Sequence, residues 1–358
     1  MVINEIALHF LRKHIKEKKY LQVINRENMA RQSLKNLKTK VIAHIETWRP
    51  YTVIWCGLLS LTGACLSNGG LPSFHIAVLS LCIPIIGWIA GLYLADYLDQ
   101  GLDTIEKAHR PIPSKRMKPV EALIAGGIFV FIGIFLTSFL GFDQLLFIII
   151  AGLLVFSYAK YTKSTGIIGN INRGFLAVVS YFFGVFAVTS NTLDIPEYVW
   201  FFAFVFFLHD ITTNIVGTLR DVSGDSRAGY VTIPVKYGIK NSIITIISLI
   251  ATWLIILVFI MLFYQLSNVF FYMMMFLEGS FIAIIIFLSL KLITNFSRKT
   301  ALDIHKVFVL ERITLTSALL FSIIDVYLSV FIFVISLFFT ALFQFVLRNQ
   351  YEFNKWEL

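Results

Sequence analysis

The stretch FHIAVLSLCIPIIGWIAGLYLADYLDQGLD, from Phe74 to Asp103, joins a long apolar run to a segment that is rich in aspartate. Its first part, residues 74–95, has the length that an α-helix needs to cross a bilayer. A second acidic segment, RDVSGD at residues 220–225, follows another apolar run. This pattern indicates a helical membrane protein with acidic groups at the ends of two of its spans.

The composition of the whole chain supports the same interpretation. Of its 358 residues, 58% are hydrophobic and only 14% are charged, and the mean hydropathy is +0.80. A soluble protein of this length could not bury so much apolar surface in its core. We therefore predict an all-α polytopic membrane protein.

The apolar runs have the lengths of membrane spans. Eight spans are predicted at residues 51–68, 74–95, 119–140, 144–160, 172–190, 196–217, 241–264 and 268–293. A last hydrophobic stretch, residues 307–347, is too long for one span, and we divide it near Asp325. Its first part carries Glu311 and Arg312, which could pair on the helix or face the bundle interior. The division predicts a ninth span and leaves open a tenth, an additional C-terminal helix.

Lys and Arg are distributed unevenly among the loops. The loops after the second, fourth, sixth and eighth spans contain them, and the intervening loops contain none. Basic loops face the cytoplasm in most membrane proteins, so both acidic segments are expected on the cytoplasmic side. This bias and the basic N-terminus account for the net charge of +9 without a nucleic-acid partner. The abundance of Ile, Lys, Phe and Asn favours an AT-rich genome and, with it, a bacterial inner membrane.

The N-terminus differs from the rest of the chain. Residues 1–48 hold ten Lys or Arg against four Glu and precede the first span. Such a segment could be an amphipathic helix on the membrane surface or a disordered basic tail. We therefore divide the chain into a basic cytoplasmic or interfacial arm (1–48), a transmembrane domain (49–325) and an additional hydrophobic helix with a C-terminal tail (326–358).

The spacing of the acidic residues indicates a chemistry. Asp99 and Asp103 are four residues apart, as are Asp221 and Asp225, so each pair projects from one face of a helix. Two carboxylates about 6 Å apart repel by roughly 3 kcal/mol at an effective dielectric constant near 20, so four of them would need cations nearby. Oxygen ligands favour Mg²⁺, which commonly binds few protein carboxylates together with phosphate oxygens. The pattern predicts a diphosphate held through Mg²⁺, and the alternative is two solvated acidic loops.

Two segments around these aspartates resemble a known family. ADYLDQGLDTIEKAHRPIPS (Ala95 to Ser114) resembles the first signature of the UbiA superfamily of intramembrane prenyltransferases, and LRDVSGDSRAGYVTIPVKYG (Leu219 to Gly238) resembles the second. WRPYT (Trp48 to Thr52) and SYAKYTKSTGIIGN (Ser157 to Asn170) are similar to two further family segments. The resemblance covers about residues 46–325. One departure is Ala95, which stands where the family usually has Asn before its first metal-binding Asp.

The resemblance implies a nine-helix UbiA-type bundle around a central cavity. It implies that catalysis and Mg²⁺ binding rest on Asp99, Asp103, Asp221 and Asp225, with Asp96 as a further ligand that could compensate for Ala95. Contacts to the substrate diphosphate are expected from Arg110, Lys163, Tyr158, Arg227 and Lys236. Arg49 is expected to face the acceptor. For these basic residues the alternative is anchoring of loops at the membrane surface.

Several functions agree with this pattern. The leading hypothesis is a membrane prenyltransferase that moves an isoprenyl group from a prenyl diphosphate to an aromatic acceptor, such as a hydroxybenzoate or quinone precursor, inside the lipid bilayer. A terpene cyclase of the same superfamily would ionise the diphosphate without an acceptor, and Ala95 favours this alternative. Other UbiA-type transfers would use a lipid or haem acceptor. A non-enzymatic transporter or lipid-binding protein would instead carry its charged residues in the middle of the spans.

Overall fold

The computed structural model describes residues 2–352. It divides at residues 45 and 46 into two units, which are described separately. The first unit is helical: α1 (Val2–Trp48) runs through it and ends just inside the second. The basic arm is thus a helix, and its position on a membrane surface stays a prediction.

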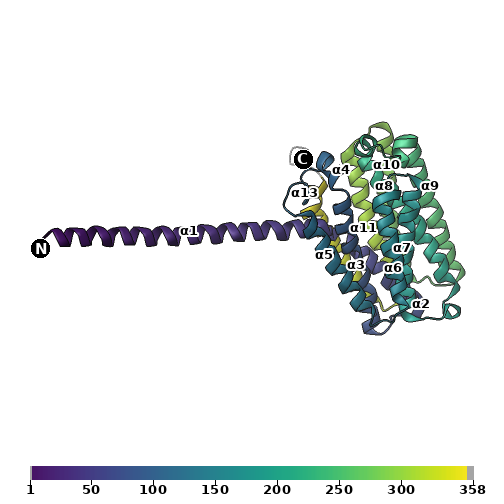
Figure 1. Cartoon of the computed structure of the whole chain (residues 1–358). Helices are drawn as coiled ribbons and strands as arrows, with labels where there is room; N and C mark the ends of the chain where they lie inside the picture. The colour runs from purple at the N-terminus through teal and green to yellow at the C-terminus, as the bar shows by residue number, and fades with distance from the viewer. Residues whose placement is uncertain (1, 353–358) are drawn as a thin grey trace. The chain divides into compact units, whose positions relative to one another are not determined.

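The second unit is a bundle of long helices (Figure 1). They are α2 (Pro50–Asn68), α3 (Phe74–Leu98), α5 (Pro119–Thr137), α6 (Gln144–Ser157), α7 (Ile167–Val188), α8 (Glu197–Arg227), α9 (Ile233–Phe263), α10 (Val269–Thr294), α11 (Arg298–Ile323) and α12 (Val326–Phe343). The shorter elements are α4 (Gln100–Glu106), α13 (Asn349–Glu352), the 3₁₀ turn η2 (Thr192–Asp194) and the π-helical turns η1 (Tyr158–Thr162) and η3 (Gln344–Arg348).

Two helices lie at the centre of this bundle. α2 packs against α3, α7, α11 and α12, and α11 also packs against α8 and α10. Both helices are buried over most of their length. The core around them is rich in large aromatic side chains, among them Trp55, Phe202, Phe206, Trp253 and Phe308. By contrast, α5, α6 and α12 bury few residues, as expected for helices that face lipid.

The predicted spans are confirmed as helices. Within residues 2–352, nine helices are long and apolar enough to cross a membrane by length and composition, eight of them at the predicted positions and the ninth at Val326–Arg348. α11 is equally long but too polar for that criterion, because it buries charged residues inside the bundle. The nine helices α2, α3 and α5–α11 with the additional α12 confirm the predicted fold class.

The long stretch 307–347 breaks where the sequence suggested. α11 ends at Ile323, and α12 begins at Val326. The side chain of Asp325 accepts hydrogen bonds from the backbone N–H groups of Tyr327 and Leu328 at 3.0 and 3.1 Å. Asp325 therefore caps the additional C-terminal helix.

One close approach brings the loop after η1 beside the second acidic segment. The backbone N–H of Val231 donates to the carbonyl of Ser164 at 2.8 Å. Gly166 has a positive φ of 65°, and a Cβ there would lie 2.5 Å from the carbonyl oxygen of Val231. Only glycine satisfies both constraints. This contact holds the loop that carries Lys163 next to the end of α8.

Candidate active site

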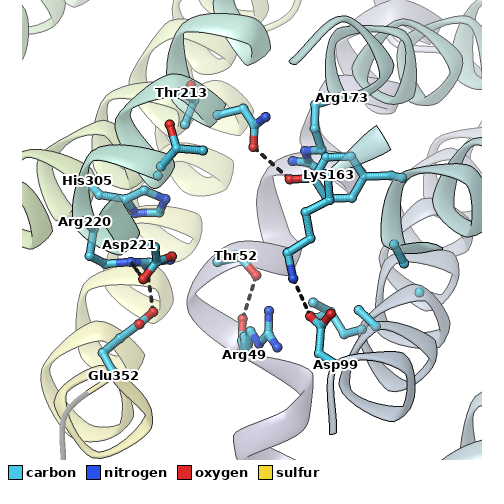
Figure 2. Close-up of a pocket in the computed structure, with 18 of the residues that line it drawn as sticks. Arg49, Thr52, Asp99, Lys163, Arg173, Thr213, Arg220, Asp221, His305 and Glu352 are labelled. Carbon is cyan, nitrogen blue, oxygen red and sulfur yellow. Dashed lines mark hydrogen bonds and ion pairs between the residues drawn. The ribbon is translucent and has the colours of Figure 1, made fainter. Parts of the chain in front are cut away.

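Both acidic segments line one polar pocket of about 280 Å³ in the second unit (Figure 2). Its lining comes from α2, α3, α4, α6, η1, α7, α8, α11 and α13 and from residues in the loops next to them. The polar lining residues include Arg49, Asp99, Asp103, Lys107, Arg110, Tyr158, Lys163, Arg173, Asn214, Arg220, Asp221, Asp225, His305, Arg312 and Glu352. Residues from positions 49 to 352 therefore meet at one place.

The first acidic segment turns at the junction of α3 and α4. Asp99 follows the last residue of α3, and the backbone N–H of Asp103 donates to the carbonyl of Asp99 at 2.8 Å. Both carboxylates line the pocket, as helical spacing predicts. Lys163 Nζ donates to Asp99 at 2.7 Å, and Arg110 binds both carboxylate oxygens of Asp103 at 2.8 and 2.9 Å.

Asp96 faces away from this pocket. It is 4% exposed and does not line the pocket. Its carboxylate accepts hydrogen bonds from Arg49 and, at 3.1 Å, from the hydroxyl of Tyr351. Asp96 is only three residues before Asp99, yet it serves a different contact, because α3 ends between them.

The second acidic segment forms the last turns of α8. Asp221 accepts hydrogen bonds from Arg220 at 2.6 Å and from Lys107 at 3.2 Å. Asp225, which is buried, accepts one from the hydroxyl of Thr232 at 3.2 Å. These partners link the end of α8 to α4 and to the start of α9.

The donor set fits Mg²⁺. Four carboxylates, Asp99, Asp103, Asp221 and Asp225, line the same pocket, and carboxylate oxygens are ligands that Mg²⁺ prefers. Among residues 2–352 no three His, Cys, Asp or Glu converge as a ready-made metal cage. A cage is not required, because Mg²⁺ commonly binds one or two protein carboxylates together with water and phosphate oxygens.

The carboxylates of the acidic segments are held by cations. Burial alone would lower the pKa of Lys163, but the neighbouring Asp99 carboxylate raises it above its ordinary value. Burial and the charge of Arg110 lower the pKa of Lys107, and Asp221 opposes that shift. These ammonium groups could exchange a carboxylate partner for a phosphate oxygen, because both anions accept charged hydrogen bonds.

The remaining residues expected at the diphosphate divide into two groups. Tyr158 and Arg49 line the pocket, and the hydroxyl of Tyr158 donates to Asn214 at 3.2 Å. Arg227 and Lys236 are exposed and do not line it, and Lys236 lies over the ring of Tyr237. Arg227 lies two residues after Asp225 on α8 and therefore on another face of that helix, and Lys236 lies one helical turn beyond Thr232, which does line the pocket.

Several pocket residues were not identified from the sequence: Arg173 from α7, His305 from α11 and Glu352 from α13. Arg312 of α11, which was expected either to pair on its helix or to face the bundle interior, also lines the pocket. A charged residue inside an apolar span is a signal of function, so Arg173 could have been noticed. Nothing in the local sequence marks Glu352.

An apolar pocket of about 330 Å³ adjoins the polar one. The two share the lining residues Trp88, Gly91, Val155 and Leu176. The apolar pocket lies among α2, α3, α5, α6 and α7, and six of its 24 lining residues are glycine. At Gly87, Gly127 and Gly152 an added Cβ would meet no atom within 4 Å. These three glycines leave open space rather than close helix contacts.

Comparisons with known proteins agree with this arrangement. The model of the UbiA prenyltransferase family matches residues 54–302. A digeranylgeranylglyceryl phosphate synthase of Pyrococcus horikoshii is 30% identical over 200 residues, which are 56% of this chain and 70% of that protein. The synthase of the same name from Korarchaeum cryptofilum is 33% identical over 206 residues, 57% of this chain and 70% of that protein.

Solved structures show the same fold. A UbiA homologue from Aeropyrum pernix aligns with a TM-score of 0.61 and 16% identity over 72% of this chain and 94% of that chain. A UbiA homologue from Archaeoglobus fulgidus bound to DMAPP and Mg²⁺ aligns with a TM-score of 0.55 and 16% identity over 76% of this chain and 99% of that chain. On the match of its sequence over 54–302, the chain belongs to the UbiA prenyltransferase family and is a multi-pass membrane prenyltransferase.

Proposed function

We propose that this enzyme transfers a long prenyl group from a prenyl diphosphate to the hydroxyl of a glycerol ether that carries a phosphate. The observation that carries the proposal is the junction of the polar and apolar pockets, which together suit a charged head and a hydrocarbon tail. The acceptor class comes from the relatives, which are named for making digeranylgeranylglyceryl phosphate. That name describes two geranylgeranyl chains on glyceryl phosphate.

These relatives do not support two finer expectations from the sequence. Their product is a glyceryl phosphate derivative, so they give no support to an aromatic acceptor. They come from archaea, so they give none to a bacterial inner membrane. We retain the proposal that the polar pocket opens toward the cytoplasm, because basic loops flank it.

In the proposed reaction the diphosphate lies between the two acidic segments. Asp99, Asp103, Asp221 and Asp225 would hold Mg²⁺, which neutralises charge on a bound diphosphate. Lys163 and Arg110 contact the phosphate oxygens. The bond between prenyl C1 and oxygen breaks, and its electron pair leaves with the diphosphate. The acceptor hydroxyl oxygen then bonds to C1, and its proton passes to the released diphosphate, so the products are an ether and pyrophosphate.

Two arginines could hold the phosphate of the acceptor. Arg312 is 4% exposed and lines the polar pocket, and its Nε has no hydrogen-bond partner within residues 2–352. Its guanidinium lies over the ring of Trp55 at 4.7 Å. Arg173 lies 3.4 Å from Asp210, whose charge also acts on Arg312. Arg312 is buried and Arg173 is partly buried, and both line the pocket, so a phosphate there could accept charged hydrogen bonds from them.

The position of this pair suits an acceptor. Asp210 precedes Asp221 on α8 by eleven residues, which correspond to about 16 Å along the helix axis. An anion at Arg173 and Arg312 would therefore lie at the far end of the pocket from the diphosphate. We infer that prenyl C1 and the acceptor hydroxyl meet between these two ends.

The function is tested with purified enzyme, Mg²⁺ and geranylgeranyl diphosphate. The acceptor is geranylgeranylglyceryl phosphate in one reaction and 4-hydroxybenzoate in another, and products are analysed by mass. We expect an ether product and pyrophosphate with the first acceptor only. A prenylated hydroxybenzoate would restore the aromatic hypothesis, and a cyclic hydrocarbon or alcohol formed without acceptor would identify a terpene cyclase.

The acceptor subsite is tested with Arg312→Met. The loss of a charged hydrogen bond is expected to raise KM for the acceptor roughly 10–100-fold and to leave KM for the prenyl diphosphate near its original value. Arg312→Lys should recover part of the loss, and Arg31→Met on α1 is the matched control. An equal rise of KM for both substrates would contradict the assignment.

A further inference from the structure

The chain after α12 returns to the polar pocket. We call residues Gln344–Glu352, which comprise η3 and α13, the C-terminal strap. Gln344 donates a hydrogen bond to the carbonyl of Lys306 at 3.3 Å, and Arg348 contacts the side chain of His305. The strap thus runs along α11, and it lies outside the residues that match the family model.

Several polar and aromatic residues of the strap are buried. Arg348 is 0% exposed, Tyr351 1% and Glu352 4%. Residues this polar are rarely buried unless specific partners hold them. Tyr351 and Glu352 have such partners, and most of them line the polar pocket.

Tyr351 lies between two arginines of the pocket. The guanidinium groups of Arg49 and Arg110 lie 4.6 and 4.5 Å from the centre of its ring. Its hydroxyl accepts a hydrogen bond from Arg49 and donates one to Asp96 at 3.1 Å. Cation–π contacts and hydrogen bonds of this kind restrict where a guanidinium can lie. The same Arg110 binds Asp103 of the first acidic segment.

Tyr351 contacts an arginine that binds the first acidic segment, and Glu352 contacts an arginine that binds the second. The carboxylate of Glu352 accepts a hydrogen bond from Arg220 at 2.8 Å, and Arg220 also binds Asp221 (Figure 2). Its backbone carbonyl accepts one from Arg298 at 3.1 Å. Burial alone would raise the pKa of Glu352, but Arg220 and Lys107 lower it to about 2. The carboxylate is therefore a permanent charge beside the site.

We propose that the C-terminal strap is a wall of the active site. In this wall, Tyr351 and Glu352 are positioning residues that fix Arg49, Arg110 and Arg220 and keep water from the reacting carbon. This inference rests on prenyl transfer and on the proposed place of the diphosphate. An allylic carbon that loses its diphosphate reacts with whichever nucleophile is near. If water supplies the oxygen, it bonds to C1 and loses a proton, so the products are a prenyl alcohol and pyrophosphate.

The experiment measures which fraction of the prenyl groups from the diphosphate ends in the ether and which fraction ends in the prenyl alcohol. Enzyme, Mg²⁺, geranylgeranyl diphosphate and geranylgeranylglyceryl phosphate are incubated, and both organic products are quantified. Tyr351→Ala and a chain that ends after Phe343 are expected to raise the alcohol share roughly tenfold. Glu352→Gln, which removes one charge, is expected to raise it roughly threefold.

Two further variants separate positioning from a general loss of structure. Tyr351→Phe keeps the ring beside the two guanidinium groups but loses the hydroxyl that bonds Arg49 and Asp96, so its alcohol share should lie between those of the original enzyme and Tyr351→Ala. Phe345→Ala changes a side chain of the same strap that is 86% exposed, and it should have no effect. The share is a ratio of products, so it does not depend on the fraction of folded enzyme.

An alcohol share that is unchanged both in Tyr351→Ala and in the truncated chain would overturn the proposal. If the original enzyme makes no ether, the proposed acceptor is wrong. The proposal about the strap is then tested in reactions that contain the prenyl diphosphate but no acceptor. In that case the rate of prenyl alcohol release from the diphosphate alone must rise in the two variants. No rise there would overturn the proposal as well.

Discussion

The polar and apolar pockets adjoin, but they are built in different ways. The polar pocket is lined by residues from Arg49 to Glu352, and several of its charged side chains pair with partners far away in the sequence, such as Lys107 with Asp221, Lys163 with Asp99 and Arg220 with Glu352. The apolar pocket is lined only by residues from Cys56 to Phe183, on neighbouring helices. The charged groups of the polar pocket are thus brought together by the whole bundle, whereas the apolar pocket is formed by the packing of five neighbouring helices.

The largest effect is expected from breaking the polar pocket. Asp99→Ala or Asp221→Ala should reduce the Mg²⁺-dependent release of pyrophosphate by on the order of 10³-fold, because each removes a proposed Mg²⁺ ligand and leaves buried cations unpaired. Asp143→Ala, in an exposed turn, is the matched control. Size-exclusion chromatography in detergent checks the fold, and full turnover in both variants would refute the metal assignment.

A smaller and more selective effect is expected from filling the apolar pocket. At Gly152 there is open space, so Gly152→Leu should occupy room for the prenyl tail without a clash. We expect kcat/KM for geranylgeranyl diphosphate to fall roughly 10–100-fold relative to that for dimethylallyl diphosphate. Gly279→Leu on α10, which is equally open but outside both pockets, is the control. An equal loss for both donors would show that the apolar pocket does not hold the tail.

The smallest expected effect is a dependence of Tm on pH, which should arise from an ion pair beside the polar pocket and not from the apolar pocket. Glu352 has its pKa lowered to about 2, so its ion pair with Arg220 is complete above its ordinary pKa of about 4.3 and is lost only as the pH falls toward 2. The difference in Tm between the original protein and Glu352→Gln should therefore be constant from about pH 5 to 9. It should shrink below about pH 4, and a change near neutral pH would contradict the assignment.

The fold was more predictable than the site. Long apolar runs predicted eight spans at the observed positions, and Asp325 marked the break before α12. The spacing by four predicted that Asp99 shares a helix face with Asp103 and that Asp221 shares one with Asp225, and in the bundle all four line one pocket. These features depend on distances of a few residues along one helix, so a local pattern carries them.

The direction of side chains near helix ends was harder to predict. Arg227 and Lys236 follow the second acidic segment closely, but Arg227 lies on another face of α8 than Asp225 and Lys236 lies beyond Thr232, and neither lines the pocket. Asp96 belongs to the first segment, and the end of α3 directs it to Arg49 instead. A sequence pattern does not contain the direction that a side chain takes after a helix ends.

By itself, the sequence determined that this chain crosses the membrane as a helical bundle and carries two acidic motifs, because hydrophobic length and spacing by four are local properties. Only the tertiary structure decided which charges surround those motifs. It places Arg173 and Arg312 in the pocket lining and brings Glu352 to Arg220 and Tyr351 to Arg110. Buried charges are stable only beside their partners, and those partners are supplied by helices that meet through folding.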